Sequence, residues 1–224
     1  MDSVITIDGP TGSGKSTVSR VLAERLNYRY LDTGAMYRAF AIAVIDANVN
    51  LQDINKIEEI CNAINIKFVR EGKSTKVLLK DKDVTKEIRR PSVDLFASNV
   101  SGLDIVRQTM VRLQRKEGIK GRLVAEGRDM GTVVFPDAKH KFYLDASMEL
   151  RVTRRFLERQ KRGESVSREK VKEDLIKRDH QDMNRRLSPL KPAKDATIID
   201  TTSLDINQVV EMIIKEIKEA NTER

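Results

Sequence analysis

Residues 9–16 read Gly-Pro-Thr-Gly-Ser-Gly-Lys-Ser and match the pattern G-x-x-x-x-G-K-[ST] at every defining position. An apolar run, Val4–Ile7, precedes them, and a segment with helical periodicity, from Gly14 to Leu26, follows them. In this context glycines let successive backbone N–H groups turn inward at a helix N-terminus, where they bind phosphate oxygens. The sequence therefore predicts a phosphate-binding loop, the P-loop, made by Gly9, Pro10, Thr11, Gly12, Ser13, Gly14, Lys15, Ser16 and Thr17.

The loop pattern also assigns individual roles. Lys15 would reach the β- and γ-phosphates of ATP, and the hydroxyl of Ser16 would be a ligand of Mg²⁺. A similar stretch, Gly72-Lys73-Ser74-Thr75, lacks the required first glycine because residue 67 is Lys, so we interpret it as a hairpin turn. ATP and Mg²⁺ are the expected cofactors.

Short apolar runs alternate with helical patterns on both sides of the loop. A helix is expected from about Ala35 to Asp46, and another after Asp205, where Gln208 completes a capping box. This alternation predicts an α/β fold with a mostly parallel five-stranded sheet covered by helices on both faces. The expected strands are Val4–Ile7, Tyr28–Leu31, Arg122–Ala125, Lys141–Leu144 and Thr197–Ile199.

One connection is too long for a simple α/β repeat, because about 75 residues separate Asp46 from the strand at Arg122. Two strands, Ile66–Val69 and Lys76–Leu79, flank a turn-prone stretch within it. We expect a small β-rich insertion at residues 48–90, followed by one long helical stretch, Ser92–Glu117.

A second unusual segment is residues 149–186. It holds 13 Lys or Arg against 8 Asp or Glu and contributes +5 of the net charge of +8. Many charges and few large apolar residues are typical of a piece that opens and closes, so we interpret the segment as a helical lid. The P-loop core would then be residues 1–47, 91–148 and 187–224.

Composition narrows the class of protein. The 224 residues include one cysteine and two histidines, which exclude a disulfide framework, a Cys-based zinc site and an iron–sulfur cluster within one chain. No apolar run approaches the roughly 20 residues that span a bilayer, and the N-terminus has no signal-peptide pattern. We expect a cytoplasmic protein with no membrane partner. The basic charge alone would suit a nucleic-acid binder, but 4% aromatic residues and no Trp disfavour stacking on bases.

The P-loop by itself does not name a reaction. The nearest match to the guanine-binding pattern N-K-x-D, Asn55-Lys56-Ile57-Glu58, ends in the wrong residue, which disfavours a GTPase. The strand at Arg122–Ala125 ends in Glu126-Gly127-Arg128-Asp129, where an arginine stands between carboxylates. A motor or helicase would normally be longer and would have a purely acidic strand end of the Walker B kind. This combination of two carboxylates with an arginine suits a second anionic ligand beside ATP, because arginine binds phosphate in a bidentate manner.

At four stretches the sequence resembles the bacterial cytidylate (CMP) kinase family, which are P-loop nucleoside monophosphate (NMP) kinases. These are residues 7–16, Leu31-Asp32-Thr33-Gly34-Ala35-Met36-Tyr37-Arg38, residues 126–138, which begin Glu-Gly-Arg-Asp-Met-Gly, and Arg178-Asp179-His180-Gln181-Asp182-Met183-Asn184-Arg185. The resemblance covers nearly the whole chain, including the β insertion, which in this family binds the monophosphate. It implies an NMP-kinase-like fold and transfer of a phosphoryl group from MgATP to CMP.

The resemblance also implies the site residues. It places Thr33, Tyr37, Arg38, Arg128 and Arg185 around the 5′-phosphate of CMP. It places Ser98, Arg107 and Asp129 at the cytosine edge, and Arg178 with Asp182 at the ribose. Catalysis is expected from Lys15, Arg128, Arg185 and the lid arginines Arg154 and Arg155.

The base assignment agrees with the chemistry of cytosine, whose N4 amino group donates and whose N3 accepts hydrogen bonds. Asp129 can accept from N4 and Arg107 can donate to N3, whereas uracil reverses both requirements. Asp129 could instead form only a structural ion pair with Arg128. Other acceptors that remain open are UMP, AMP and a small metabolite such as shikimate. The family generally accepts dCMP as well as CMP and acts as a monomer.

Overall fold

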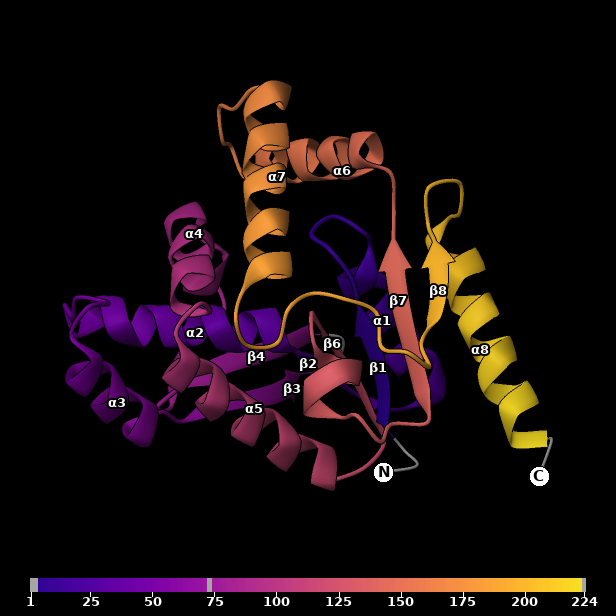
Figure 1. Ribbon diagram of the computed structural model, residues 1–224, viewed down its shortest axis with the longest axis horizontal. Coiled ribbons are helices and arrows are strands. Elements are labelled where there is room, and N and C mark those ends of the chain that lie inside the picture. Colours follow the sequence, from indigo (N-terminus) through magenta and orange to yellow (C-terminus); the bar gives the residue numbers. More distant parts are fainter. Residues whose placement is uncertain (1–3, 72–73, 223–224) are drawn as a thin grey trace. The chain divides into compact units, whose positions relative to one another are not determined.

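The computed structural model describes residues 4–71 and 74–222 (Figure 1). The chain divides into two compact units, one formed by Met1–Tyr30 with Glu117–Arg224 and the other by Leu31–Lys116. The turn at Gly72 and Lys73 lies outside the described residues. No helix within the described ranges is both long and apolar enough to cross a membrane.

The first unit is built on a five-stranded sheet in the order β2-β6-β1-β7-β8. The central strand β1 pairs in parallel with β6 and β7, and β7 pairs in parallel with β8. The predicted parallel sheet is confirmed, with strand bounds of Val4–Asp8 (β1), Arg29–Asp32 (β2), Leu123–Gly127 (β6), His140–Asp145 (β7) and Thr197–Asp200 (β8).

Two helices cover this sheet through a shared apolar core. Helix α1 (Lys15–Leu26) contributes Val18 and Leu22, and α8 (Ile206–Thr222) contributes Val210 and Ile213. These side chains pack against strand residues that include Ile5, Ile7, Val124, Phe142 and Leu144. The three central strands, β6, β1 and β7, are recognisable in sequence as apolar runs because both of their faces are buried.

Local signals define the helix ends. The predicted capping box is confirmed: the backbone N–H of Asp205 donates to the side chain of Gln208, and that of Gln208 donates to the side chain of Asp205, both at 2.9 Å. Helix α1 ends at Asn27, which is left-handed with φ 54°, and the N–H of Tyr28 returns to the carbonyl of Ala23 at 2.8 Å.

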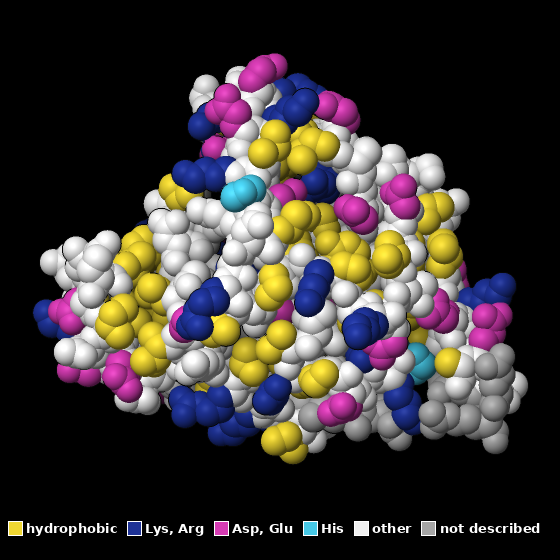
Figure 2. All heavy atoms as spheres, viewed as in Figure 1, with side chains coloured by type: hydrophobic (Ala, Val, Ile, Leu, Met, Phe, Trp, Pro, Cys, Tyr) yellow, Lys and Arg dark blue, Asp and Glu magenta, His cyan; other side chains and the backbone are white. Residues whose placement is uncertain are grey.

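The charged segment forms two helices, α6 (Met148–Lys161) and α7 (Arg168–Asn184), as the predicted helical character requires. They enclose a small core of their own, made by Val152, Val171 and Leu175. Their outer faces carry ion pairs such as Lys170 with Glu173 and Asp174. Figure 2 shows both signs of charge interspersed in this region, which is at the top of the view.

The second unit contains a three-stranded antiparallel sheet, β3 (Ile66–Glu71), β4 (Ser74–Leu79) and β5 (Lys82–Asp83). The expected hairpin is confirmed within the described residues. Around it lie α2 (Thr33–Asp46), α3 (Ile54–Ala63), the 3-10 turn η1 (Glu87–Arg89) and α4 (Pro91–Val100).

Two features of this part of the chain differ from the sequence expectations. Helix α3 was not predicted, although Asp53 caps it and it buries Ile57 and Cys61 at the i, i+4 spacing of one helix face. The single helical stretch predicted from Ser92 to Glu117 is wrong. It is two helices, α4 and α5 (Asp104–Ile119), because the chain turns at residues 101–103, where the N–H of Gly102 bonds the carbonyl of Asn99 at 3.1 Å.

A close approach near the end of α5 gives a stability prediction. A Cβ atom at Gly118 would lie 2.4 Å from Cε1 of the fully buried Phe135. Gly118→Ala gains at most about 1 kcal/mol of helix propensity, whereas forcing a methyl into a packed core costs about 1–3 kcal/mol. We therefore expect a net loss in the free energy of unfolding, measured by urea denaturation. The exposed position Lys116 provides the control, since Lys116→Ala should change stability by less than about 0.5 kcal/mol; a stabilised Gly118→Ala would contradict the packing argument.

Candidate active site

The P-loop leaves the carboxyl end of β1 in a conformation that only glycine tolerates at key positions. Gly9 has φ +151°, and a Cβ atom there would lie 2.1 Å from the carbonyl oxygen of Leu144. Gly12 has φ +83° and lies against the backbone of Arg151, where a Cβ would be 3.1 Å from the carbonyl oxygen. The loop is therefore threaded closely between β7 and α6, with its N–H groups at the start of α1.

Lys15, the first residue of α1, is a buried cation. Its Nζ donates to the carbonyl oxygen of Pro10 at 3.1 Å. Burial, and then the charge of Arg128, lower the pKa of Lys15 to about 7, although the carboxylate of Glu126 opposes them. A site that disfavours its own ammonium charge gains from an anionic ligand, which restores that charge. Lys15 is thus suited to a phosphate.

Ser16 lies beside an acidic residue at the end of β6. Its hydroxyl donates to Oε2 of Glu126 at 2.8 Å, and the hydroxyl of Tyr30 donates to Oε1 of the same carboxylate. Glu126 is buried. Hydroxyl and carboxylate oxygens fit Mg²⁺, which is held by one or two protein oxygens together with substrate phosphates. Correspondingly, the described residues contain no group of three or more His, Cys, Asp or Glu side chains that could hold a metal alone.

Asp8, the last residue of β1, holds the segment that follows β6. Its two carboxylate oxygens accept from the backbone N–H groups of Met130 and Gly131, at 2.9 and 2.8 Å. These residues begin the short π-helix η2 (Met130–Val134). Burial raises the pKa of Asp8 to about 7, in spite of those two hydrogen bonds. The contact fixes the backbone directly after Arg128 and Asp129, which are both predicted site residues.

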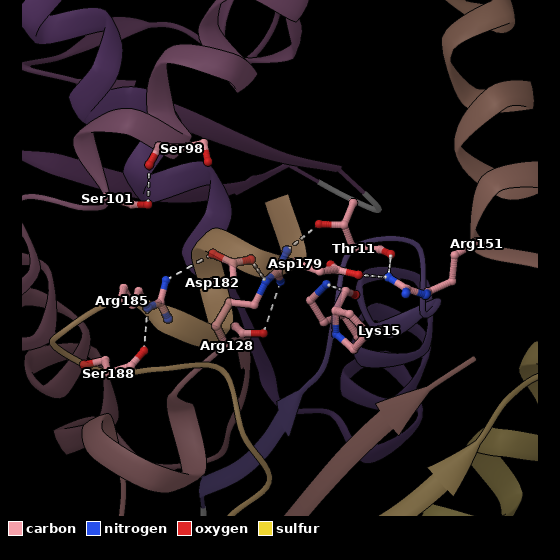
Figure 3. A network of polar contacts seen from close by, with 12 residues as sticks. Thr11, Lys15, Ser98, Ser101, Arg128, Arg151, Asp179, Asp182, Arg185 and Ser188 are labelled. Carbon is pink, nitrogen blue, oxygen red and sulfur yellow. Dashed lines mark hydrogen bonds and ion pairs between the residues drawn. The ribbon is translucent and has the colours of Figure 1, made fainter. Parts of the chain in front are cut away.

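Arg128 connects the P-loop to α7. Its Nη2 donates to the hydroxyl of Thr11 at 2.7 Å, and its Nε donates to Oδ2 of Asp182 at 2.8 Å (Figure 3). Asp182 also accepts from Nη1 of Arg185 at 3.3 Å. Burial alone would raise the pKa of Asp182, but the charges of Arg128, Arg178 and Arg185 outweigh it and lower that pKa. This cationic cluster next to the P-loop is suited to a second phosphate.

The two lid arginines predicted to be catalytic lie in different surroundings. Arg154 approaches the P-loop, with Nη1 3.3 Å from the carbonyl oxygen of Gly12 and from the hydroxyl of Thr201. Arg155 pairs with Glu158 one turn further along α6, at 2.9 Å. The structure thus brings Arg154 to the P-loop.

Two buried residues that sequence reasoning missed join the lid helices to the loop. Nη1 of Arg151 donates to Oδ2 of Asp179 at 2.6 Å and to the carbonyl oxygen of Thr11 at 3.2 Å (Figure 3). Nothing in the charge pattern distinguishes Arg151 from the other arginines of this segment. Asp8 and Glu126 were also not assigned, although their positions at the carboxyl ends of predicted strands were a usable signal.

The remaining predicted residues lie in the second unit. Nη2 of Arg38 donates to Oδ2 of Asp32 at 3.1 Å, and Asp94 lies 3.8 Å from Nη1. The guanidinium of Arg107 lies over the ring of Tyr37, 5.6 Å from its centroid, and its Nη1 donates to the carbonyl of Ser101 at 3.2 Å.

Two further members of this group, Thr33 and Ser98, lie on α2 and α4. Thr33 is buried at the first position of α2, and the carbonyl of Ser98 accepts from the hydroxyl of Ser101 at 2.8 Å. The second unit therefore gathers the predicted residues Thr33, Tyr37, Arg38, Ser98 and Arg107. The first unit gathers the P-loop with Arg128, Asp129, Arg154, Arg178, Asp182 and Arg185.

A parallel α/β sheet with a phosphate-binding loop at the end of its central strand defines the class of P-loop proteins. The family described as "Cytidylate kinase" matches residues 5–219 of the chain. The chain therefore belongs to the cytidylate kinase family.

Full-length relatives carry the same name. A "Cytidylate kinase" of Geobacter sp. (strain M21) is 45% identical over 216 residues, which cover 96% of this chain and 93% of that protein. One of Carboxydothermus hydrogenoformans is 45% identical over 217 residues, covering 97% and 98%. A solved structure of an uncharacterized protein from Eubacterium ventriosum has a TM-score of 0.52 at 16% identity, covers 96% of this chain and 98% of that one, and supports the fold alone.

The buried pair Arg151–Asp179 generates a prediction, because its side chains are only 8% and 9% exposed. Removing one partner of a buried ion pair leaves an uncompensated charge and costs about 3–5 kcal/mol. Arg151→Met should lower the free energy of unfolding by that amount in urea denaturation, and adding Asp179→Leu should recover much of it.

The matched control is Lys172, whose ion pair with Glu149 also joins α7 to α6 but is 50% and 73% exposed. Lys172→Met should cost less than about 1 kcal/mol. Equal losses in Arg151→Met and Lys172→Met would contradict the prediction.

Proposed function

We propose that this protein transfers the γ-phosphoryl group of ATP to the 5′-phosphate of CMP, and also of dCMP, giving ADP and the diphosphate. Membership of the cytidylate kinase family supports the reaction. The observation that carries it is the position of Arg128. Its side chain contacts Thr11 of the P-loop and also Asp182, the carboxylate at the centre of the cationic cluster next to the P-loop. The reaction needs two phosphates side by side, and this geometry provides cations for both.

The chemistry needs no general base, because the acceptor oxygen belongs to a phosphate that is already ionised at neutral pH. Catalysis then depends on in-line positioning and on cations that stabilise charge on the moving phosphoryl group. Lys15 is buried, the side chain of Arg128 is only 16% exposed, and both are fixed by hydrogen bonds, so their charges act in surroundings of low dielectric constant. Mg²⁺, when bound, would supply further charge neutralisation beside Ser16 and Glu126.

The roles at CMP follow the family resemblance, residue by residue. Arg128, Arg185, Thr33, Tyr37 and Arg38 serve the 5′-phosphate. Asp129, Arg107 and Ser98 serve the cytosine edge, and Arg178 with Asp182 serve the ribose. Asp129 and Arg107 are buried polar residues, and the family resemblance is what assigns them to the base edge.

Segment 149–186 acts as the lid in this proposal. Its helices have a separate small core, which supports movement as a unit, and Arg154 and Arg155 are the arginines that it brings to the phosphoryl group. Closure would exclude water and so prevent ATP hydrolysis. Residues 48–90 would serve as the monophosphate-binding insertion, and residues 1–47, 91–148 and 187–224 as the core. A cytoplasmic monomer acting on small molecules, without nucleic acid, completes the proposal.

The direct test is ADP release from MgATP with CMP, dCMP, UMP, AMP, shikimate or no acceptor. We expect turnover with CMP and dCMP to exceed that with UMP by at least about tenfold, which is the order of discrimination given by one well-made base contact. A preference for another acceptor would void the base-contact roles. Hydrolysis independent of any acceptor would contradict the kinase reaction.

The pKa of Lys15 gives a second test. With a pKa near 7, the amine is mostly neutral above that pH and mostly charged below it. Because the phosphates of MgATP favour the charged form, binding should take up close to one proton at about pH 8.5 and almost none at about pH 5.5. Calorimetry in buffers with different ionisation enthalpies measures this uptake. Lys15→Met should abolish it; uptake that persists in the variant would assign the proton to another group, such as Asp8.

A further inference from the structure

Thr11 is a P-loop residue that two arginines outside the loop hold. Its carbonyl oxygen accepts from Nη1 of Arg151 at 3.2 Å, and its hydroxyl accepts from Nη2 of Arg128 at 2.7 Å (Figure 3). Arg151 belongs to α6, and Arg128 follows β6. Thr11 is therefore connected to α6 through its backbone and to the cationic cluster that contains Arg128 through its side chain.

The backbone contact makes Thr11 a fixed acceptor. Directly after it, Gly12 lies so near α6 that an added Cβ would be 3.0 Å from Cβ of Arg151. Arg151 is itself held by Asp179 at 2.6 Å, and both side chains are buried. The loop has no room to move toward α6 at this point, so the position of the Thr11 hydroxyl is set by packing as well as by hydrogen bonding.

That hydroxyl completes the fixation of Arg128. The guanidinium has one contact at each nitrogen: Nε with Asp182 at 2.8 Å, Nη1 with the carbonyl of Gly127 at 3.3 Å, and Nη2 with Thr11. These contacts use three of its five N–H groups, so Nη1 and Nη2 each keep one further N–H that these contacts do not use. A guanidinium plane held in this way can offer two donors to a phosphate without first losing rotational freedom.

We propose that Thr11, although it belongs to the ATP loop, is a positioning residue for the acceptor, because its hydroxyl orients Arg128 toward the 5′-phosphate of CMP. The proposal rests on the proposed CMP kinase reaction and deepens it. It assigns the side chain of Thr11 to the second substrate, while the backbone of the loop remains assigned to ATP. A substitution in the ATP loop should then impair the use of CMP.

The test compares Thr11→Val, which keeps the shape but loses the hydroxyl, with Thr11→Ser, which keeps the hydroxyl. Thr11→Val should raise the KM for CMP about tenfold, the order expected for one hydrogen bond to a charged group, while the KM for ATP changes less than about twofold. Thr11→Ser should have a KM for CMP close to that of the unmodified enzyme, because it keeps the hydroxyl. Thr11→Ala should resemble Thr11→Val and provides a second hydroxyl-free variant, with thermal denaturation to check folding.

A double-mutant cycle tests whether Thr11 acts through Arg128. In an Arg128→Met background, Thr11→Val should add less than about twofold to the loss of CMP affinity measured by calorimetry, because the guanidinium that the hydroxyl orients has been removed. If the two substitutions reduce CMP affinity by independent factors that multiply in the double variant, the proposal is overturned. It is also overturned if Thr11→Val raises the KM for ATP and not the KM for CMP. If the unmodified enzyme does not phosphorylate CMP, the proposed function fails first. If the unmodified enzyme phosphorylates CMP and Thr11→Val leaves the KM for CMP unchanged, only the role of Thr11 is overturned.

Discussion

The burial of positive charge at the carboxyl end of the central sheet is the constraint on which the site depends. Lys15 is buried and the side chain of Arg128 is only 16% exposed, so each needs fixed partners to remain in place. The structure supplies backbone carbonyls and the carboxylates of Glu126 and Asp182, but for Lys15 the balance still lowers the pKa to about 7. An arrangement that is electrostatically incomplete without an anion favours phosphate over neutral ligands.

This constraint connects the loop, the strands and the helices of the first unit. Asp8 at the end of β1 fixes the segment after β6, and that segment presents Arg128 to Asp182 on α7. Arg151 on α6 then returns to the P-loop at Thr11. Each contact joins residues that are distant in sequence, so the site is assembled only when the parallel sheet and the two lid helices have packed.

The sheet could be predicted from the sequence because its central strands are buried on both faces and appear as apolar runs such as Val4–Ile7. The capping box at Asp205 and Gln208 could also be read, since both partners lie within one helical turn. The break between α4 and α5 was missed because the two helical segments are joined by a turn of only three residues, 101–103. Helix α3 was missed because it is short and buries only Ile57 and Cys61.

By itself the sequence determined the P-loop, the α/β class and the family resemblance, because each is encoded in contiguous residues with fixed spacing. It also supplied Arg128 and Asp182 as members of one site, but only through that resemblance. Tertiary structure alone decided that Glu126 faces Ser16, that Arg151 pairs with Asp179, and that Thr11 holds Arg128. These are side-chain contacts across 28 to 117 residues of chain, and no local pattern of propensity or charge specifies which carboxylate meets which cation.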